Sequence, residues 1–136
     1  MSPVGHAAYW RLYREVKEAA VMSKVFGMHM IAIKPGVKAE DFEKFMQEEA
    51  LPSFLLEGVK GYLLKGDRGD REGKYLVMYE FESVEARDRY FPSPGETSKE
   101  AQQSFDASGV FALMEKWGKF ATPIDTIYTD YIEVSG

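Results

Sequence analysis

Apolar side chains along the chain follow two periods, and the change from one to the other predicts the secondary structure. Alternation with period two, rich in β-branched and aromatic residues, predicts strands at 25–34, 61–65, 74–82 and 125–134. Helical spacing predicts helices over 40–50, 84–91 and 97–120, the first of which should end before Pro52. From residue 25 on, the predicted order is therefore β-α-β-β-α-β, with two helices in the second helical connection.

Local signals mark the ends of these elements. Pro35-Gly36 is a turn signal after the first strand, and the polar, glycine-rich residues 66–73 predict a hairpin between the second and third strands. Ser83 is a good N-cap for the helix that follows it. Residues 97–100 (TSKE) fit a capping box, in which the Thr side chain caps the helix and the Glu reaches back. Gly109 is a weak point in that last helix.

This order predicts an α+β domain with a ferredoxin-like antiparallel sheet that carries its helices on one face. The other face of the sheet is then bare. Met28 and Met30 alternate with His29, so we expect the two methionines on the bare face and His29 beneath the helices. Because small soluble domains rarely expose a large apolar face, we expect two copies to pair through it as a homodimer.

Residues 1–24 are expected to form an N-terminal helical extension that is separate from the domain at 25–136. Its apolar residues at helical spacing are Tyr9, Leu12, Tyr13 and Val16, with Trp10 beside them. They predict a short amphipathic helix that packs either on the domain or on a partner chain. Alternatively, Met22 is the true start of the protein and the preceding residues are an extension of the assigned reading frame.

Composition and charge exclude several classes of function. The 17 Lys and Arg are interleaved with 22 Asp and Glu, for a net charge of −5, so the chain lacks the basic face that nucleic acid or an anionic membrane would require. Without cysteine there are no disulfides, thiol nucleophiles or Cys-ligated metals. No stretch approaches the ~18 apolar residues of a membrane span. With no signal-peptide core at the N-terminus, we expect a cytoplasmic protein.

Two short segments carry a resemblance to a known family. Residues 29–34 (HMIAIK) resemble the first strand, and 81–85 (FESVE) the junction of third strand and helix, of the dimeric α+β barrel superfamily. The nearest group is the stress-responsive dimeric α/β-barrel (Dabb) group, which includes a plant polyketide cyclase; the resemblance spans about 25–134. It implies a homodimer with a small-molecule pocket between sheet and helices.

The sequence departs from that cyclase where the catalysis lies. Tyr90 falls where the cyclase has a pocket tyrosine, but the cyclase then carries a His-Pro-x-His segment whose second His is the base. Residues 91–96 (FPSPGE) contain no histidine, so that base is not carried over. The sequence is also similar in fold to antibiotic-biosynthesis monooxygenases, but none of their motifs is intact.

His29 is the leading candidate for chemistry in such a pocket. An imidazole titrates near neutral pH, so His29 is expected to act as a polar anchor or a base, with Tyr90 as its hydrogen-bond partner. The other residues expected to line the pocket are Tyr75, Tyr79, Trp117, Phe120 and Glu96. The alternatives are a histidine satisfied by one hydrogen bond, ordinary core packing for the aromatic residues and a solvated carboxylate for Glu96.

Two hypotheses of function remain. One is a cofactor-free enzyme, cyclase- or monooxygenase-like, that acts on a small aromatic or polyketide-like molecule. The other is a non-catalytic, stress-associated or ligand-binding dimer with a packed core. We expect no metal, because a site needs about three convergent ligands and the two histidines, His6 and His29, are far apart in the sequence, with His6 in the N-terminal extension. No glycine-rich phosphate loop opens a helix, so we expect no nucleotide cofactor.

Overall fold

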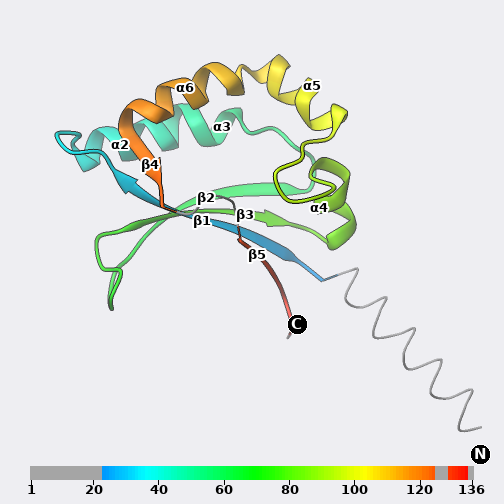
Figure 1. The fold of residues 1–136 in the computed structure, drawn as a ribbon, viewed down its shortest axis with the longest axis horizontal. Coiled ribbons are helices and arrows are strands. Elements are labelled where there is room, and N and C mark those ends of the chain that lie inside the picture. The colour runs from blue at the N-terminus through cyan, green and yellow to red at the C-terminus, as the bar shows by residue number, and fades with distance from the viewer. Residues whose placement is uncertain (1–22, 125–128, 135–136) are drawn as a thin grey trace, which may run out of the picture.

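The computed structural model describes residues 23–124 and 129–134 and is built around a five-stranded sheet. The strands are β1 (Val25–Ile33), β2 (Val59–Lys65), β3 (Tyr75–Phe81), β4 (Ala121–Pro123) and β5 (Thr129–Ile132). All pairings are antiparallel, and β2, β3 and β1 lie side by side in that order (Figure 1). Both β4 and β5 pair with the other edge of β1, β4 near its end and β5 near its start. The helix predicted for the N-terminal extension lies outside the described residues.

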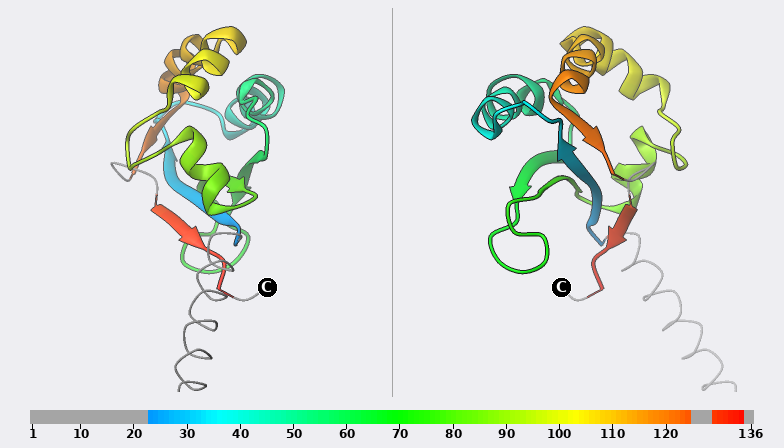
Figure 2. Two further views of the ribbon diagram at one scale, coloured as in Figure 1. Left: turned by 90° about the vertical axis from the view of Figure 1, so that its right-hand side faces the viewer. Right: turned by 60° about the vertical axis from the view of Figure 1, so that its left-hand side comes forward.

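The helices of the described chain gather over one face of the sheet, with α4 at one end (Figures 1 and 2). They are α2 (Ala39–Phe45), the π-helix η1 (Met46–Ala50), α3 (Leu51–Ser53), α4 (Val84–Tyr90), α5 (Lys99–Ser108) and α6 (Val110–Phe120). The α+β class predicted from the sequence is therefore confirmed. The hairpin predicted at 66–73 does connect β2 and β3.

The first helical segment continues past Pro52, although the sequence predicts that it ends before this residue. Inside an α-helix a proline clashes with the carbonyl four residues earlier and lacks an N–H for the usual bond. Here the turn before Pro52 widens into η1, where the Leu51 N–H donates to the Met46 carbonyl. The wider turn allows the helix to run on to Ser53, whose hydroxyl donates to the Ala50 carbonyl at 2.7 Å.

The caps of the later helices were predicted in part. Ser83 caps α4, as expected, by accepting a hydrogen bond from the Ala86 N–H at 3.1 Å. The prediction of a capping box at 97–100 is wrong, because the side chain that accepts a hydrogen bond from a backbone N–H of α5 is that of Ser98 and not that of Thr97. The predicted helix over 97–120 is in fact two helices, α5 and α6. They divide at Gly109, whose φ of +76° is a left-handed conformation that favours glycine.

The last predicted strand, 125–134, is also different in the structure. The chain pairs with β1 in two pieces, β4 and β5, and 125–128 lies outside the described residues. Pro123, opposite Ile31, is the last residue of β4, and its missing N–H costs no bond to β1 because it lies at a non-hydrogen-bonded position of the ladder. The Ile124 N–H then donates to the Met30 carbonyl at 2.8 Å, and β5 begins beyond it, at Thr129.

Two apolar clusters fill the space between the helices and the sheet. The first cluster consists of Ile31, Phe42, Phe45, Met46, Tyr75, Val77 and Ala121. The second cluster consists of Leu56, Tyr90, Ala101, Phe105 and Val110. Phe54 connects them, since its ring centroid lies 4.3 Å from that of Tyr79, at the margin of the first cluster, and 5.1 Å from that of Phe105 in the second.

The opposite face of the sheet, here named the open sheet face, carries a second set of apolar side chains. The strand register places on it Phe26, Met28, Met30, Ala32, Tyr62, Leu64, Leu76, Met78 and Tyr131. No helix of the described residues lies over this face (Figures 1 and 2). The side chains of Met30 and Leu64 are accordingly exposed in the single chain.

Candidate functional site

His29 lies on the helix-facing side of β1, as its alternation with Met28 and Met30 predicts. Its register partner on β3 is Val77, a buried member of the first cluster. Val25 and Ile31, which lie on the same face of β1, are each only 1% exposed, whereas His29 is half-buried. The two apolar clusters therefore leave the His29 side chain partly exposed.

A glycine and an ion pair adjoin His29 on the same face of the sheet. Gly27 is two residues away along β1, about 7 Å, and a Cβ built on it would lie 3.1 Å from Oδ1 of Asp130, its partner on β5. The other oxygen of Asp130 accepts from Nη1 of Arg87 on α4 at 2.6 Å. The hydrogen bonds to Asp130 and Asp88 keep the pKa of Arg87 above its ordinary value despite partial burial. We name Gly27, His29, Arg87 and Asp130 the His29 niche.

Tyr79 is the neighbour of Gly27 on β3, but its ring points toward β2 and away from the His29 niche. It pairs with Gly27 on one side and with Gly61 of β2 on the other. A Cβ on Gly61 would lie 3.1 Å from the Tyr79 ring, so the ring lies over Gly61, where it packs on Phe54. The space above Gly27 is instead taken by Asp130 and Phe81, whose Oδ1 and Cε2 atoms lie 3.1 and 3.7 Å from a Cβ built there.

Tyr75 is a buried member of the first cluster, and its hydroxyl donates to Glu43 of α2. Nζ of Lys65 lies 3.7 Å from the same carboxylate and 5.6 Å from the centre of the Tyr75 ring. Burial, together with the bond to Glu43 and its negative charge, raises the pKa of Tyr75 to about 12. The phenol therefore stays protonated and serves as a donor to Glu43.

This burial predicts a change of stability in alkaline solution. The pKa of Tyr75 in the folded state, about 12, exceeds the ordinary value of 10.0, so its contribution to folding is complete below pH 10 and is lost as the pH rises toward 12. We expect Tyr75→Phe to flatten the alkaline part of the curve of unfolding free energy against pH. An unfolding curve of Tyr75→Phe that is parallel to wild type above pH 10 would contradict this reading.

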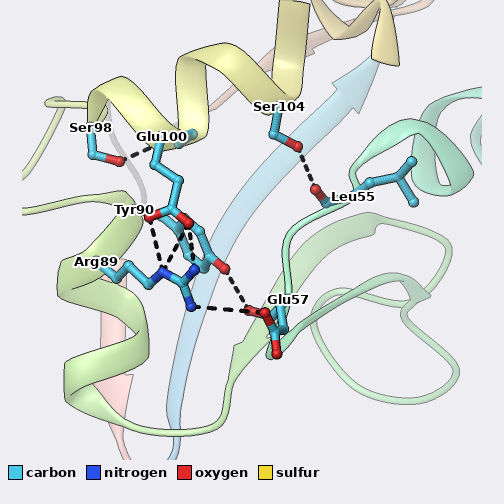
Figure 3. A network of polar contacts seen from close by, with 8 residues as sticks. Leu55, Glu57, Arg89, Tyr90, Ser98, Glu100 and Ser104 are labelled. Carbon is cyan, nitrogen blue, oxygen red and sulfur yellow. Dashed lines mark hydrogen bonds and ion pairs between the residues drawn. The ribbon is translucent and has the colours of Figure 1, made fainter. Parts of the chain in front are cut away.

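Tyr90 lies in the second cluster, and its hydroxyl is engaged with the backbone (Figure 3). It donates to the Glu57 carbonyl at 2.8 Å, which fastens α4 to the segment before β2. Arg89 stacks on the Tyr90 ring at 5.2 Å and donates from Nε to Glu100 of α5 at 2.9 Å. Desolvation raises the pKa of Tyr90, so this phenol also stays neutral. To act as a hydrogen-bond partner for a ligand, it would have to release Glu57.

The remaining predicted residues occupy different surroundings. Trp117 and Phe120, both on α6, pack against the first cluster, and the ring of Phe120 stacks on that of Phe45 at 4.9 Å. Glu96 is exposed in the segment between α4 and α5, where it accepts a hydrogen bond from the Ser93 hydroxyl. The structure thus brings Tyr75, Tyr79, Trp117 and Phe120 together around the first cluster. Tyr90 belongs to the second cluster, and Glu96 to neither.

A hollow of about 280 Å3 lies at the end of the sheet, beyond the last pair of β1 with β3. Its lining consists of Ile31, Ala32, Ile33, Gly73, Lys74, Tyr75 and Ile124. Of the residues predicted for a pocket, only Tyr75 contributes to this lining. The hollow is distinct from the His29 niche, which is built on the opposite half of β1.

Sequence reasoning did not find Arg87 and Asp130. Asp130 gave no usable signal, because it stands among other polar residues of 125–134 and an exposed carboxylate needs no partner. Its partner could not be read from the sequence, since Arg87 is 43 residues away. Within the described residues there is no group of three or more His, Cys, Asp or Glu placed to hold a metal ion. Nor does any helix of residues 23–124 have the length and apolarity to cross a bilayer.

Fold and site together define a class: an α+β domain with a helix-covered antiparallel sheet, a histidine niche under the helices and an open apolar face. Comparison with protein-family models, curated proteins and solved structures finds no match for the chain. The function is therefore argued from this geometry.

Proposed function

We propose that the protein is a ferredoxin-like homodimer, a dimeric α+β barrel, whose two copies pair through their open sheet faces. The observation that carries the proposal is the set of apolar side chains on a sheet face that no described helix covers. The order β2-β3-β1-β4 and the antiparallel pairing also support this fold. The resemblance of residues 29–34 and 81–85 to the dimeric α+β barrel superfamily points the same way.

The open sheet face is large enough for a stable interface. Four adjacent strands about 4.8 Å apart, and nine residues of β1 at about 3.3 Å each, make a face of roughly 19 by 30 Å. Because side chains that project from the sheet add accessible area to this flat outline, the area of the face approaches the ~800 Å2 that each partner buries in a stable complex. Among the residues within the described strands, the charges on this face are Lys60 and Glu80, which pair in register at one end, where Lys24 lies 4.0 Å from Glu80. The apolar centre therefore needs no charge to be desolvated.

The mass of the particle in solution tests this assembly. Sedimentation equilibrium at tens of micromolar is expected to give twice the chain mass of 15.5 kDa, or an even multiple built on that dimer. A single-chain mass at that concentration would overturn the proposed dimer.

The proposed ligand site is the His29 niche. A small aromatic or polyketide-like molecule would bind beside His29, with the imidazole as its polar anchor or as a base toward a phenol. Tyr75 and Tyr90 donate their hydroxyls within the protein and stay neutral, so neither phenol is proposed as the base. Such an enzyme needs no cofactor. The partial exposure of His29, between the buried Val25 and Ile31 on the same face of β1, supports this site.

A thermal-shift series against phenols, quinones and polyketide-like aromatics tests ligand binding. A compound at a hundred times its dissociation constant stabilises the native state by about 2.7 kcal/mol, which raises the unfolding midpoint by several degrees. We expect His29→Ala to lose this response and His6→Ala, the change of the other histidine, to keep it. A response that survives in His29→Ala would place the ligand elsewhere.

The alternative is a non-catalytic dimer with a filled core. The mutual packing of aromatic rings favours it, because Phe42 contacts both Tyr75 and Phe120, at 5.3 and 6.5 Å between centroids. Under this alternative, no compound raises the midpoint, and His29→Ala lowers the stability of the unliganded protein. Under the enzyme proposal, by contrast, a compound raises the midpoint, and His29→Ala leaves the stability of the unliganded protein nearly unchanged.

A further inference from the structure

The edge strand β5 carries apolar side chains that the rest of the described chain leaves uncovered. It pairs with β1 alone, and all four of its residues are exposed. Tyr131 and Ile132 are 53% and 46% exposed, and Val134 just beyond the strand is 95% exposed. Ile132 and Val134 share one side of the strand and are named the β5 patch, whereas Tyr131 lies on the open sheet face. An exposed apolar edge strand promotes aggregation, and proteins usually cover such an edge with a helix or loop.

The N-terminal extension joins the domain beside this patch. Val25 pairs with Ile132 across the ladder, and the Glu133 N–H donates to the Lys24 carbonyl at 2.9 Å. Figure 2 shows the start of β1 directly beside β5. Whatever precedes Ser23 therefore enters the molecule next to the β5 patch.

The sequence of the extension suits this position. A helix over 8–20 would be about 20 Å long, with Tyr9, Leu12 and Val16 on one side and Arg11, Glu15 and Glu18 on the other. Only residues 21–24 separate it from β1, a connection of at most about 14 Å. The C-terminal end of such a helix must lie near the start of β1, so the β5 patch is an exposed apolar surface within its reach.

We propose that residues 8–20 dock as a helix on the β5 patch of their own chain and cover the edge of the sheet. The apolar stripe would bury Ile132 and Val134, and the charged side would face solvent. Ile132 shares the helix-facing side of the sheet with Val25, so this docking site is separate from the centre of the open sheet face. The inference therefore stands or falls independently of the proposed dimer.

Tryptophan fluorescence tests the docking in the full chain. Trp10 and Trp117 are the two tryptophans, so Trp117→Phe leaves Trp10, at the margin of the stripe, as the probe. We expect a blue-shifted emission and acrylamide quenching several-fold slower than for an exposed tryptophan. Adding Ile132→Asp should restore exposed emission, whereas adding Met114→Asp, on the exposed side of α6, should not. An exposed Trp10 in Trp117→Phe, or one that ignores Ile132→Asp, would overturn the proposal.

Disulfide trapping separates docking within one chain from docking between copies. The chain has no cysteine, so Ile132→Cys can be combined in turn with cysteine at the apolar positions 9, 12, 16 and 20. We expect at least one pair to form a cross-link within a single chain, and the polar-side controls at 11, 15 and 18 to form none. Cross-linked pairs of chains would instead assign the patch to a second copy. No cross-link at any apolar position would overturn docking altogether.

Discussion

Met30→Lys is expected to convert the proposed dimer into a monomer. Met30 lies near the middle of the open sheet face, between Leu76 on β3 and the Ile124 N–H that binds its carbonyl. Two-fold symmetry would bury two ammonium groups in one apolar interface, at a cost of several kcal/mol each. Since 1.4 kcal/mol is a factor of ten, dimer affinity should fall about a thousandfold or more. Sedimentation equilibrium measures this directly.

The single chain should tolerate the same substitution. Met30 is 36% exposed in one copy, so its replacement leaves the clusters under the helices intact, and thermal unfolding at low concentration should change little. The matched control is Met114→Lys, which puts the same charge on α6, where the methionine is also exposed. This control should remain dimeric. If Met30→Lys keeps twice the chain mass, the open sheet face is not the interface.

Phe42→Ala is expected to cause the largest loss of stability of any single truncation considered. Phe42 is completely buried, and its ring meets Tyr75 edge-on at 5.3 Å and Phe120 at 6.5 Å. Removing a ring from such a site costs about 3–5 kcal/mol, against a total of roughly 5–15 kcal/mol for a domain. Urea unfolding should show the loss as a lower midpoint. Phe111→Ala, at a half-exposed ring on α6, is the control and should cost under about 1 kcal/mol.

The result for Phe42 also bears on function. A loss of this size would mean that the first cluster is packed throughout, and would leave the His29 niche as the site for a ligand. A loss below about 1 kcal/mol would mean that the cluster refills the vacated space. The aromatic residues Tyr75, Trp117 and Phe120 would then have the freedom to line a pocket, as the sequence suggested.

Local patterns predicted the elements that depend on local physics. The alternation along β1 gave the side of the sheet for Met28, His29 and Met30, because successive side chains of a strand point to opposite faces. The hairpin at 66–73 and the Ser83 cap were also predicted, since turns and caps are made by residues a few positions apart. The same patterns failed at Pro52, because a widened turn is set by how the whole segment packs on the sheet.

Contacts between distant segments determined the rest. Glu100 pairs with Arg89 of α4 and does not reach back in a capping box, and Ser98 caps α5. Tyr75 was assigned to the pocket from its residue type and Tyr90 from the resemblance to the cyclase, and the structure places them in two clusters with different acceptors.

By itself, then, the sequence determined the α+β class, the strands near 25–34, 61–65 and 74–82, and the apolar character of the face opposite His29. Only the tertiary structure decided that the chain returns to β1 in two pieces and that Arg87 holds Asp130 beside Gly27. The physical reason is that the periodicity of apolar residues indicates which side of an element is buried, but not which atoms a buried side chain contacts. Those contacts depend on which distant segments of the chain pack against it.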